Sequence, residues 1–282
     1  MAVTWNIMPL FPLLSALLMP LTFFITYAWS VALGHVEPVF PYISSTGAYP
    51  PESNFFSFML DIISVLMAVT VWARHKQVLG HYNQTLVCKD LEKTSRIATL
   101  FGLSSAFGLF LVGNFQSSTI TTVHLIGAVL AFGLGTVYQW LQSWMSVCLS
   151  PHVNSRGVMV VRFICSAMAT LLIITTVVFS VLHDVANQGK EVAYWAQNKA
   201  WWQAEGRKKW SYHVLATSSE WVLAFTFVAM LLTLVPEFKR MSFHGVKMHY
   251  DRDRRQVREI DGARSTEAIV ASSSRSQEST AL

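Results

Sequence analysis

The sequence predicts an all-α, polytopic membrane protein with six transmembrane helices. Its 282 residues are 52% hydrophobic and 13% charged, with a mean hydropathy of +0.40, whereas an average soluble domain carries about 25% charged residues. The chain also holds six apolar runs long enough to cross about 30 Å of hydrocarbon, which takes about 20 helical residues. A transmembrane β-barrel would instead show many alternating segments of about ten residues. The sequence lacks that alternation.

The expected spans follow one another through a transmembrane domain of residues 1–235, and residues 236–282 form a tail. The first apolar run is expected to be retained as a span, because no Lys or Arg precedes it and it is longer than the apolar part of a secretory signal. The tail is basic and then Ser-rich, so we expect it to be largely disordered. The spans are expected at about residues 7–33, 55–73, 96–113, 121–148, 159–182 and 211–235.

The distribution of basic residues predicts an orientation. The loops after spans two and four, together with the tail, hold 16 of the Lys and Arg residues, whereas the other side holds 5. Because cytoplasmic loops carry the basic excess, both termini are expected in the cytosol. The basic residues are scattered and include no motif that reads DNA or RNA, so nucleic acid is not an expected partner.

Small residues predict where helices approach one another. Gly127, Ala131 and Gly135 recur every four residues in span four, and Gly102 lies in a similar row in span three. In lipid, such residues let helix backbones pack closely. We expect them to form contact faces, although ordinary small-residue content of a membrane helix is the alternative.

A set of polar residues lies within or next to the spans, where polar groups are costly. Three interpretations compete: structural contacts between helices, a pocket for a lipid head group or small ligand, and a catalytic or metal site. No zinc-type or nucleophile-elbow spacing supports the third. We therefore assign no catalytic residue and expect neither metal nor cofactor. The set comprises Asp61, Asn114, Gln116, His124, His213 and Glu220.

The segment PYISSTGAYPPES, residues 41–53, separates the first two spans and is rich in turn residues. Its prolines and Gly47 favour a compact turn. Pro51 and Glu52 suit the first turn of span two, because proline is tolerated there and an acid complements the positive helix end. The segment is expected to be a structured lid beside the polar set.

Several stretches, in this order on six spans, make the chain similar to a known family: PYISSTGAYPPES, VGNFQ, HLIGAVLAFGLGTVYQWLQ, YHVLATSSEWVLAFTF and MHYD. Residues 7–251 resemble the damage-regulated autophagy modulator (DRAM) family. That family belongs to a wider six-span group with members that support phosphatidylinositol 4-kinase recruitment or GPI-anchor remodelling. Matching positions in the first loop are Pro41, Tyr42, Ile43, Gly47, Pro51 and Glu52.

The resemblance implies a lysosomal or endosomal membrane protein that modulates autophagy through protein or lipid contacts, without an established catalytic activity. One alternative is a plasma-membrane scaffold that supports recruitment of a phosphoinositide kinase. Another is an intramembrane lipid-modifying enzyme. The resemblance therefore implies that the chain is not an enzyme. It also implies that the lipid bilayer is the main partner of the chain.

Two segments depart from the family pattern. The loop of residues 194–210 interleaves tryptophans with basic residues, a composition typical of the head-group interface. The tail places basic residues where anionic phospholipids of the cytosolic leaflet could attract them. It ends in STAL, whose Thr280 and Leu282 match a PDZ ligand, although chance accounts for so short a match.

Overall fold

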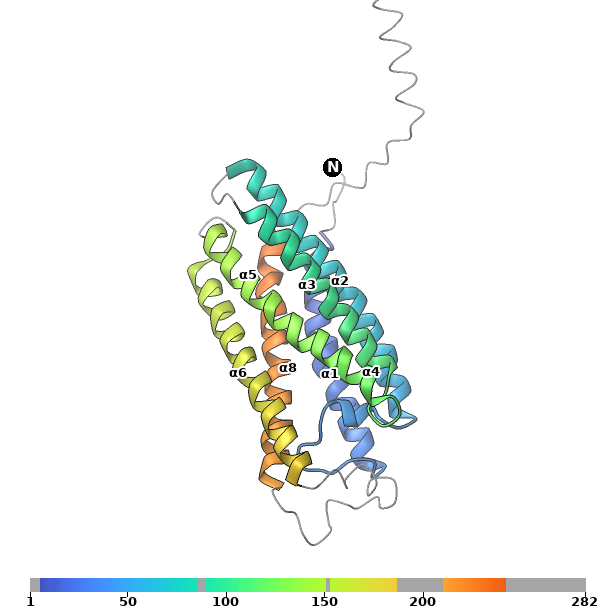
Figure 1. Cartoon of the computed structure of the whole chain (residues 1–282). Helices are drawn as coiled ribbons and strands as arrows, with labels where there is room; N and C mark the ends of the chain where they lie inside the picture. Colours follow the sequence, from blue (N-terminus) through green and yellow to red (C-terminus); the bar gives the residue numbers. More distant parts are fainter. Residues whose placement is uncertain (1–5, 86–89, 151–152, 187–209, 242–282) are drawn as a thin grey trace, which may run out of the picture. The chain divides into compact units, whose positions relative to one another are not determined.

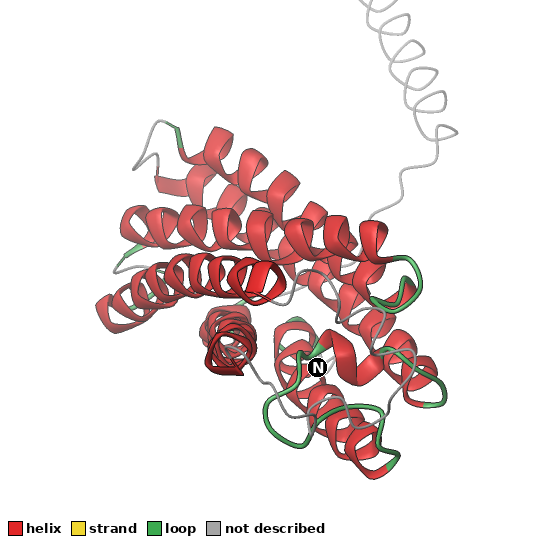
Figure 2. Cartoon of the chain, turned by 60° about the horizontal axis from the view of Figure 1, so that its bottom comes forward, coloured by secondary structure: helices red, strands yellow, loops and turns green. Residues whose placement is uncertain are grey.

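The computed structural model describes residues 6–85, 90–150, 153–186 and 210–241. The chain divides into two units, Met1–Ser242 and Phe243–Leu282, and all described residues belong to the first. Regular structure in the described ranges is helical throughout (Figure 2). Residues 242–282 of the predicted tail, with Thr280 and Leu282, and the aromatic stretch of residues 194–209 lie outside these ranges.

Within the described ranges, six helical segments are long and apolar enough to cross a membrane, which confirms the predicted all-α, six-span fold. Most extend a few residues beyond the expected bounds, because the polar residues at their ends continue the helix. The fourth span is continuous but has a π-helical centre. In chain order the helices are α1 (Leu10–Ala32), α2 (Glu52–Thr85), α3 (Leu91–Asn114), α4 (Thr121–Ala128), the π-helical segment η2 (Val129–Leu134), α5 (Gly135–Leu149), α6 (Arg156–Ala186) and α8 (Trp210–Phe238) (Figure 1).

The six spans form a closed ring in chain order. Each span packs against the next, from α1 to α2, α3, the α4–α5 span, α6 and α8, and α8 packs back against α1. The largest buried cluster includes Phe23, Leu60 and Trp221, from α1, α2 and α8. The ring thus brings the first and last spans side by side.

Glycine contacts join α3 to the fourth span. A Cβ atom on Gly108 would meet the backbone of Gly127 and Ala131, so only glycine permits this approach. Ser105 Oγ donates a hydrogen bond of 2.7 Å to the Ala131 carbonyl, inside the π-helical segment. Two of the residues predicted for packing therefore lie at this contact, and their partner is Gly108.

The other two predicted packing glycines lie against different neighbours. A Cβ atom on Gly102 would approach Val71 of α2 at 2.8 Å, and one on Gly135 would approach the Phe227 ring of α8 at 2.5 Å. Both positions are therefore restricted by large side chains. The row of small residues on the fourth span thus serves two neighbouring helices.

A buried ion-pair network closes the end of the bundle where α2, α5, α6 and α8 meet. Arg74 and Arg162 are fully buried, and Glu237, 3% exposed, pairs with both. Sequence reasoning placed the two arginines in loops and Glu237 in the tail. The structure corrects this, because all three residues lie on the long helices α2, α6 and α8, where both arginines pair with the one glutamate inside the bundle.

Candidate functional site

The segment between α1 and α2 covers the opposite end of the bundle. We call residues 33–51 the capping loop; Figure 2 brings its end forward. Its centre forms a short 3-10 turn, Ser44–Gly47, with Thr46 and Gly47 buried. A Cβ atom on Gly47 would lie 2.5 Å from Phe56 Cδ1, so the glycine lets the turn rest on α2. The expected structured lid is therefore a packed part of the fold.

Side chains of α1 and α8 satisfy backbone groups of the capping loop. Trp221 Nε1 donates to the Pro41 carbonyl at 2.9 Å, and Tyr27 donates to the Pro38 carbonyl at 2.7 Å. The Ile43 N–H donates to Glu220 Oε2 at 3.0 Å. Irregular backbone at membrane depth is tolerated only where such groups find partners. These contacts explain why a turn-rich segment can dock there.

Two histidine–carboxylate pairs fasten the loop further. His213 Nε2 lies 2.6 Å from Glu37 Oε1, and both side chains are almost fully buried. His35 pairs with Glu52 in the first turn of α2. The loop is thus tied to α8 and α2 by two histidine–carboxylate hydrogen bonds.

Aromatic and hydroxyl contacts surround these pairs. The Tyr42 ring lies edge-on to the His213 ring, with the ring centroids 5.4 Å apart. The ring centroids of His183, on α6, and His213 are 5.1 Å apart. The Tyr42 hydroxyl is 2.8 Å from Ser180 Oγ, also on α6. Tyr49 packs beside His35, and burial raises the pKa of its phenol above its usual value. These contacts place aromatic rings of the loop against both paired histidines and against α6.

Two more hydrogen bonds join the loop to distant elements. The hydroxyls of Thr26 and Thr46 are 2.9 Å apart and buried, and Ser118 donates to the Ala48 carbonyl at 2.8 Å. Ser118 belongs to the turn between α3 and α4. The capping loop consequently contacts α1, α2, α6, α8 and this turn, so it holds most of the ring together at one end.

The structure divides the six predicted polar residues among separate groups. Asn114 donates to Asp61 at 2.6 Å near the surface, and His124 donates from Nδ1 to the Phe115 carbonyl at 2.7 Å. Gln116 accepts a hydrogen bond from Thr119 in the α3–α4 turn. Only His213 and Glu220 contact the capping loop. The six residues thus do not line one pocket, and each contributes to a local contact.

The residues matching the family pattern in the loop have distinct positions. Pro41 is buried and offers its carbonyl to Trp221, whereas Ile43 is buried and offers its N–H to Glu220. Pro51 is exposed and follows a cis peptide bond from Pro50. Within the described ranges, no three His, Cys, Asp or Glu side chains are arranged to hold a metal ion.

Sequence reasoning missed Glu37, His35 and Tyr27, three main partners of this site. Each lies near the end of the first span, where its residue type alone is unremarkable. One signal was available, because Glu37 is the only acidic residue among the first 51 and lies just ahead of Pro38 in an otherwise apolar stretch. An isolated acid in such surroundings calls for a buried partner.

The fold and the site define a multi-pass membrane protein whose first loop is built into one end of its helix ring. Residues 7–241 match the family described as "Frag1/DRAM/Sfk1/Cwh43P N-terminal domain". The chain belongs to this family, which confirms the resemblance found in the sequence. No solved structure matches the chain.

Similar proteins cover most of the chain. It is 32% identical over 235 residues to "DNA damage-regulated autophagy modulator protein 2" of Mus musculus, covering 81% of this chain and 85% of the relative. It is 34% identical over 220 residues to "DNA damage-regulated autophagy modulator protein 1" of Homo sapiens, covering 78% and 86%. "Modulator of macroautophagy TMEM150B" of Danio rerio is 29% identical over 208 residues, covering 73% of each chain.

Proposed function

We propose that this protein modulates autophagy from a lysosomal or endosomal membrane through contacts with proteins or lipids, without catalysing a reaction. The observation that carries the proposal is the similarity, over 81% and 78% of the chain, to two relatives named as autophagy modulators. The family match spans residues 7–241 and so includes all six helices and the capping loop. The proposal therefore concerns the whole described unit.

The use of polar side chains at the loop end supports a non-catalytic role. Glu220 accepts a backbone N–H, His213 pairs with Glu37, and Trp221 donates to a carbonyl. A catalytic acid or base needs to reach a substrate at hydrogen-bonding distance, whereas these groups are committed to the loop. In the proposed mechanism the capping loop is a fixed contact surface, with Val39, Phe40 and Pro51 among its exposed residues.

Two contacts are proposed for the tail. Its basic part would attract anionic phospholipids, and Thr280 and Leu282 would bind a PDZ domain by adding a strand to its sheet. Flotation of the full chain with vesicles of neutral or anionic phospholipid tests the first. Comparison of wild type with Leu282→Asp in pull-down by PDZ domains tests the second, and equal recovery of the two proteins would reject it.

Localisation and autophagic flux test the main proposal together. A tagged full-length protein should reside on lysosomal or endosomal membranes, and deletion of its gene should lower autophagic flux during starvation. Residence only at the plasma membrane, unchanged by starvation and accompanied by unchanged flux, would instead favour the scaffold alternative.

A further inference from the structure

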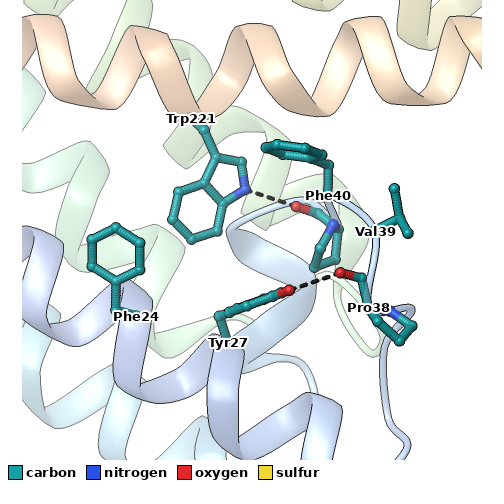
Figure 3. Close-up of a pocket in the computed structure, with 7 residues that line it drawn as sticks. Phe24, Tyr27, Pro38, Val39, Phe40 and Trp221 are labelled. Atoms are coloured by element: carbon teal, nitrogen blue, oxygen red, sulfur yellow. Dashed lines mark hydrogen bonds between the residues drawn. The ribbon is translucent and has the colours of Figure 1, made fainter.

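A cavity of about 300 Å³ lies between α1, α8 and the capping loop (Figure 3). Phe24 and Tyr27 of α1 approach Trp221 of α8, with ring centroids 5.7 and 6.0 Å from the indole. Residues 38–41 of the capping loop close one side. This volume lies at the small end of the range of about 300–1,000 Å³ found for ligand pockets. The cavity thus has aromatic walls contributed by both ends of the sequence.

The polar atoms of the lining side chains are already used. The Tyr27 O–H donates to the Pro38 carbonyl and the Trp221 N–H donates to the Pro41 carbonyl, as the dashed lines in Figure 3 show. The other lining side chains are those of Phe, Pro and Val. No donor among the lining side chains remains for a head group or hydroxyl, so the chemistry of the cavity suits a hydrocarbon.

The cavity lies at a depth where the bilayer supplies hydrocarbon. The span Ser211–Phe238 has 28 residues, about 42 Å at 1.5 Å per residue, against about 30 Å of hydrocarbon. Trp221 lies ten residues from its start, about 15 Å along the helix axis. A centred span thus puts the indole about 9 Å inside the hydrocarbon region.

The rim of the cavity faces the lipid. Phe24 is 53% exposed and follows Leu21 and Leu17 along one exposed stripe of α1, since residues three and four apart share a helix face. On α8, Phe225 is also exposed and lies 6.2 Å from the Phe24 ring, centroid to centroid. A lipid chain lying along the seam between α1 and α8 therefore reaches the cavity without leaving apolar surroundings.

Phe40 adds an independent observation. Its φ is 46°, in the left-handed region that a bulky residue rarely adopts. Strained backbone of this kind concentrates at ligand-binding sites, and Phe40 forms part of the cavity wall.

The driving force for binding a lipid chain here is not the hydrophobic effect, because lipid tails are as apolar as the cavity wall. Dispersion contacts that an empty cavity would lack favour a bound chain.

We infer that this cavity holds one acyl chain of a bilayer phospholipid. The inference does not depend on the role in autophagy, because it needs only the protein and a membrane. A sterol is disfavoured, since no side-chain donor of the lining remains for its hydroxyl.

Photocrosslinking in nanodiscs tests the inference. The full-length protein is reconstituted with phosphatidylcholine that carries a diazirine in the middle of one acyl chain, and labelled residues are mapped by mass spectrometry after irradiation. A parallel sample contains a diazirine-bearing sterol. We expect phospholipid labelling to concentrate on the segments that hold Phe24, residues 38–41 and Trp221, above that of other exposed faces.

The matched variants are Val39→Trp, which enlarges a residue that lines the cavity, and Val65→Trp, which adds the same side chain at an exposed position of α2. Val39→Trp should lower labelling of the cavity about tenfold, which corresponds to a loss of about 1.4 kcal/mol of binding free energy. Val65→Trp should leave labelling of the cavity unchanged. If Val39→Trp does not fold, Val39→Phe and Val65→Phe replace the pair. Cavity labelling equal to that of the α2 face, insensitive to the Val39 variant, or stronger with the sterol would overturn the inference.

Discussion

Glu37 and His213 are 176 positions apart in the chain, yet Oε1 of the first lies 2.6 Å from Nε2 of the second inside the protein. Their pairing joins the capping loop to the last span. Because α8 also closes the ring against α1, this contact helps to fix the loop at the point where the first and last helices meet. The capping loop is therefore part of the core of the membrane unit.

We expect Glu37→Ala to destabilise the protein by about 1.5–3 kcal/mol, because it leaves a buried histidine without its carboxylate. Thermal unfolding in detergent, followed by loss of the monodisperse gel-filtration peak, measures the change. The matched control is Glu92→Ala, which removes an exposed carboxylate paired with Arg96. Exposed pairs contribute about 0–1 kcal/mol, so equal effects of the two variants would contradict a buried anchor.

Glu220 should matter as a hydrogen-bond acceptor and not as a charge. Glu220→Gln keeps an oxygen for the Ile43 N–H, whereas Glu220→Leu leaves this backbone donor unpaired, at about 1–3 kcal/mol. An Ile43→Cys reporter, placed at a position 5% exposed, should react with maleimide faster when combined with Glu220→Leu. It should react at an unchanged rate with Glu220→Gln. Equal acceleration by both variants would show that the charge itself holds the loop.

The network of Arg74, Arg162 and Glu237 predicts an order of stability set by buried charge. Its three side chains sum to one positive charge; Glu237→Gln raises this to two, whereas Arg162→Gln lowers it to zero. Removing one partner of a buried pair costs about 3–5 kcal/mol. We expect Glu237→Gln to reduce the melting temperature and folded yield more than Arg162→Gln, and the reverse order would argue against this explanation.

Gly108 provides a test of the close contact between α3 and the fourth span. Gly108→Ala places a methyl group against the Gly127 carbonyl and should cost about 1–3 kcal/mol, as overpacking generally does. Gly80→Ala is the control, since nothing lies within 4 Å of its added Cβ. It should be neutral or stabilising by up to about 1 kcal/mol. Similar thermal stability of the two variants would mean that the helices separate easily at Gly108.

The spans were predictable because hydropathy is a local property of the sequence, and the small residues of span four could be assigned to packing for the same reason. Pairings between side chains of different helices could not be predicted in this way. Arg162 sits among apolar residues, and its partner Glu237 lies 75 positions later, so a count of basic residues assigned Arg162 to a loop and Glu237 was assigned to the tail. The π-helical segment also escaped prediction, because nothing in its composition distinguishes it from ordinary α-helix.

For the capping loop as well, the sequence predicted local structure but not long-range contacts. Its turn residues indicated a compact structure, and the structure shows one. Its contacts with Trp221 and Glu220 depend on α8 lying beside α1, which local sequence does not specify. The predicted set of six polar residues was grouped by expected depth alone, whereas position around the ring decides which side chains meet.

Autophagic flux in cells that lack this protein tests the central claim most directly. The measurement is lysosome-dependent turnover of an autophagosome-membrane marker during starvation, in deletion cells with and without re-expression of the tagged wild-type chain, together with the location of the tag. We predict that flux falls on deletion, returns on re-expression, and that the tag lies on lysosomal or endosomal membranes. Unchanged flux in deletion cells, with the re-expressed protein folded and confined to the plasma membrane, would contradict the proposed function.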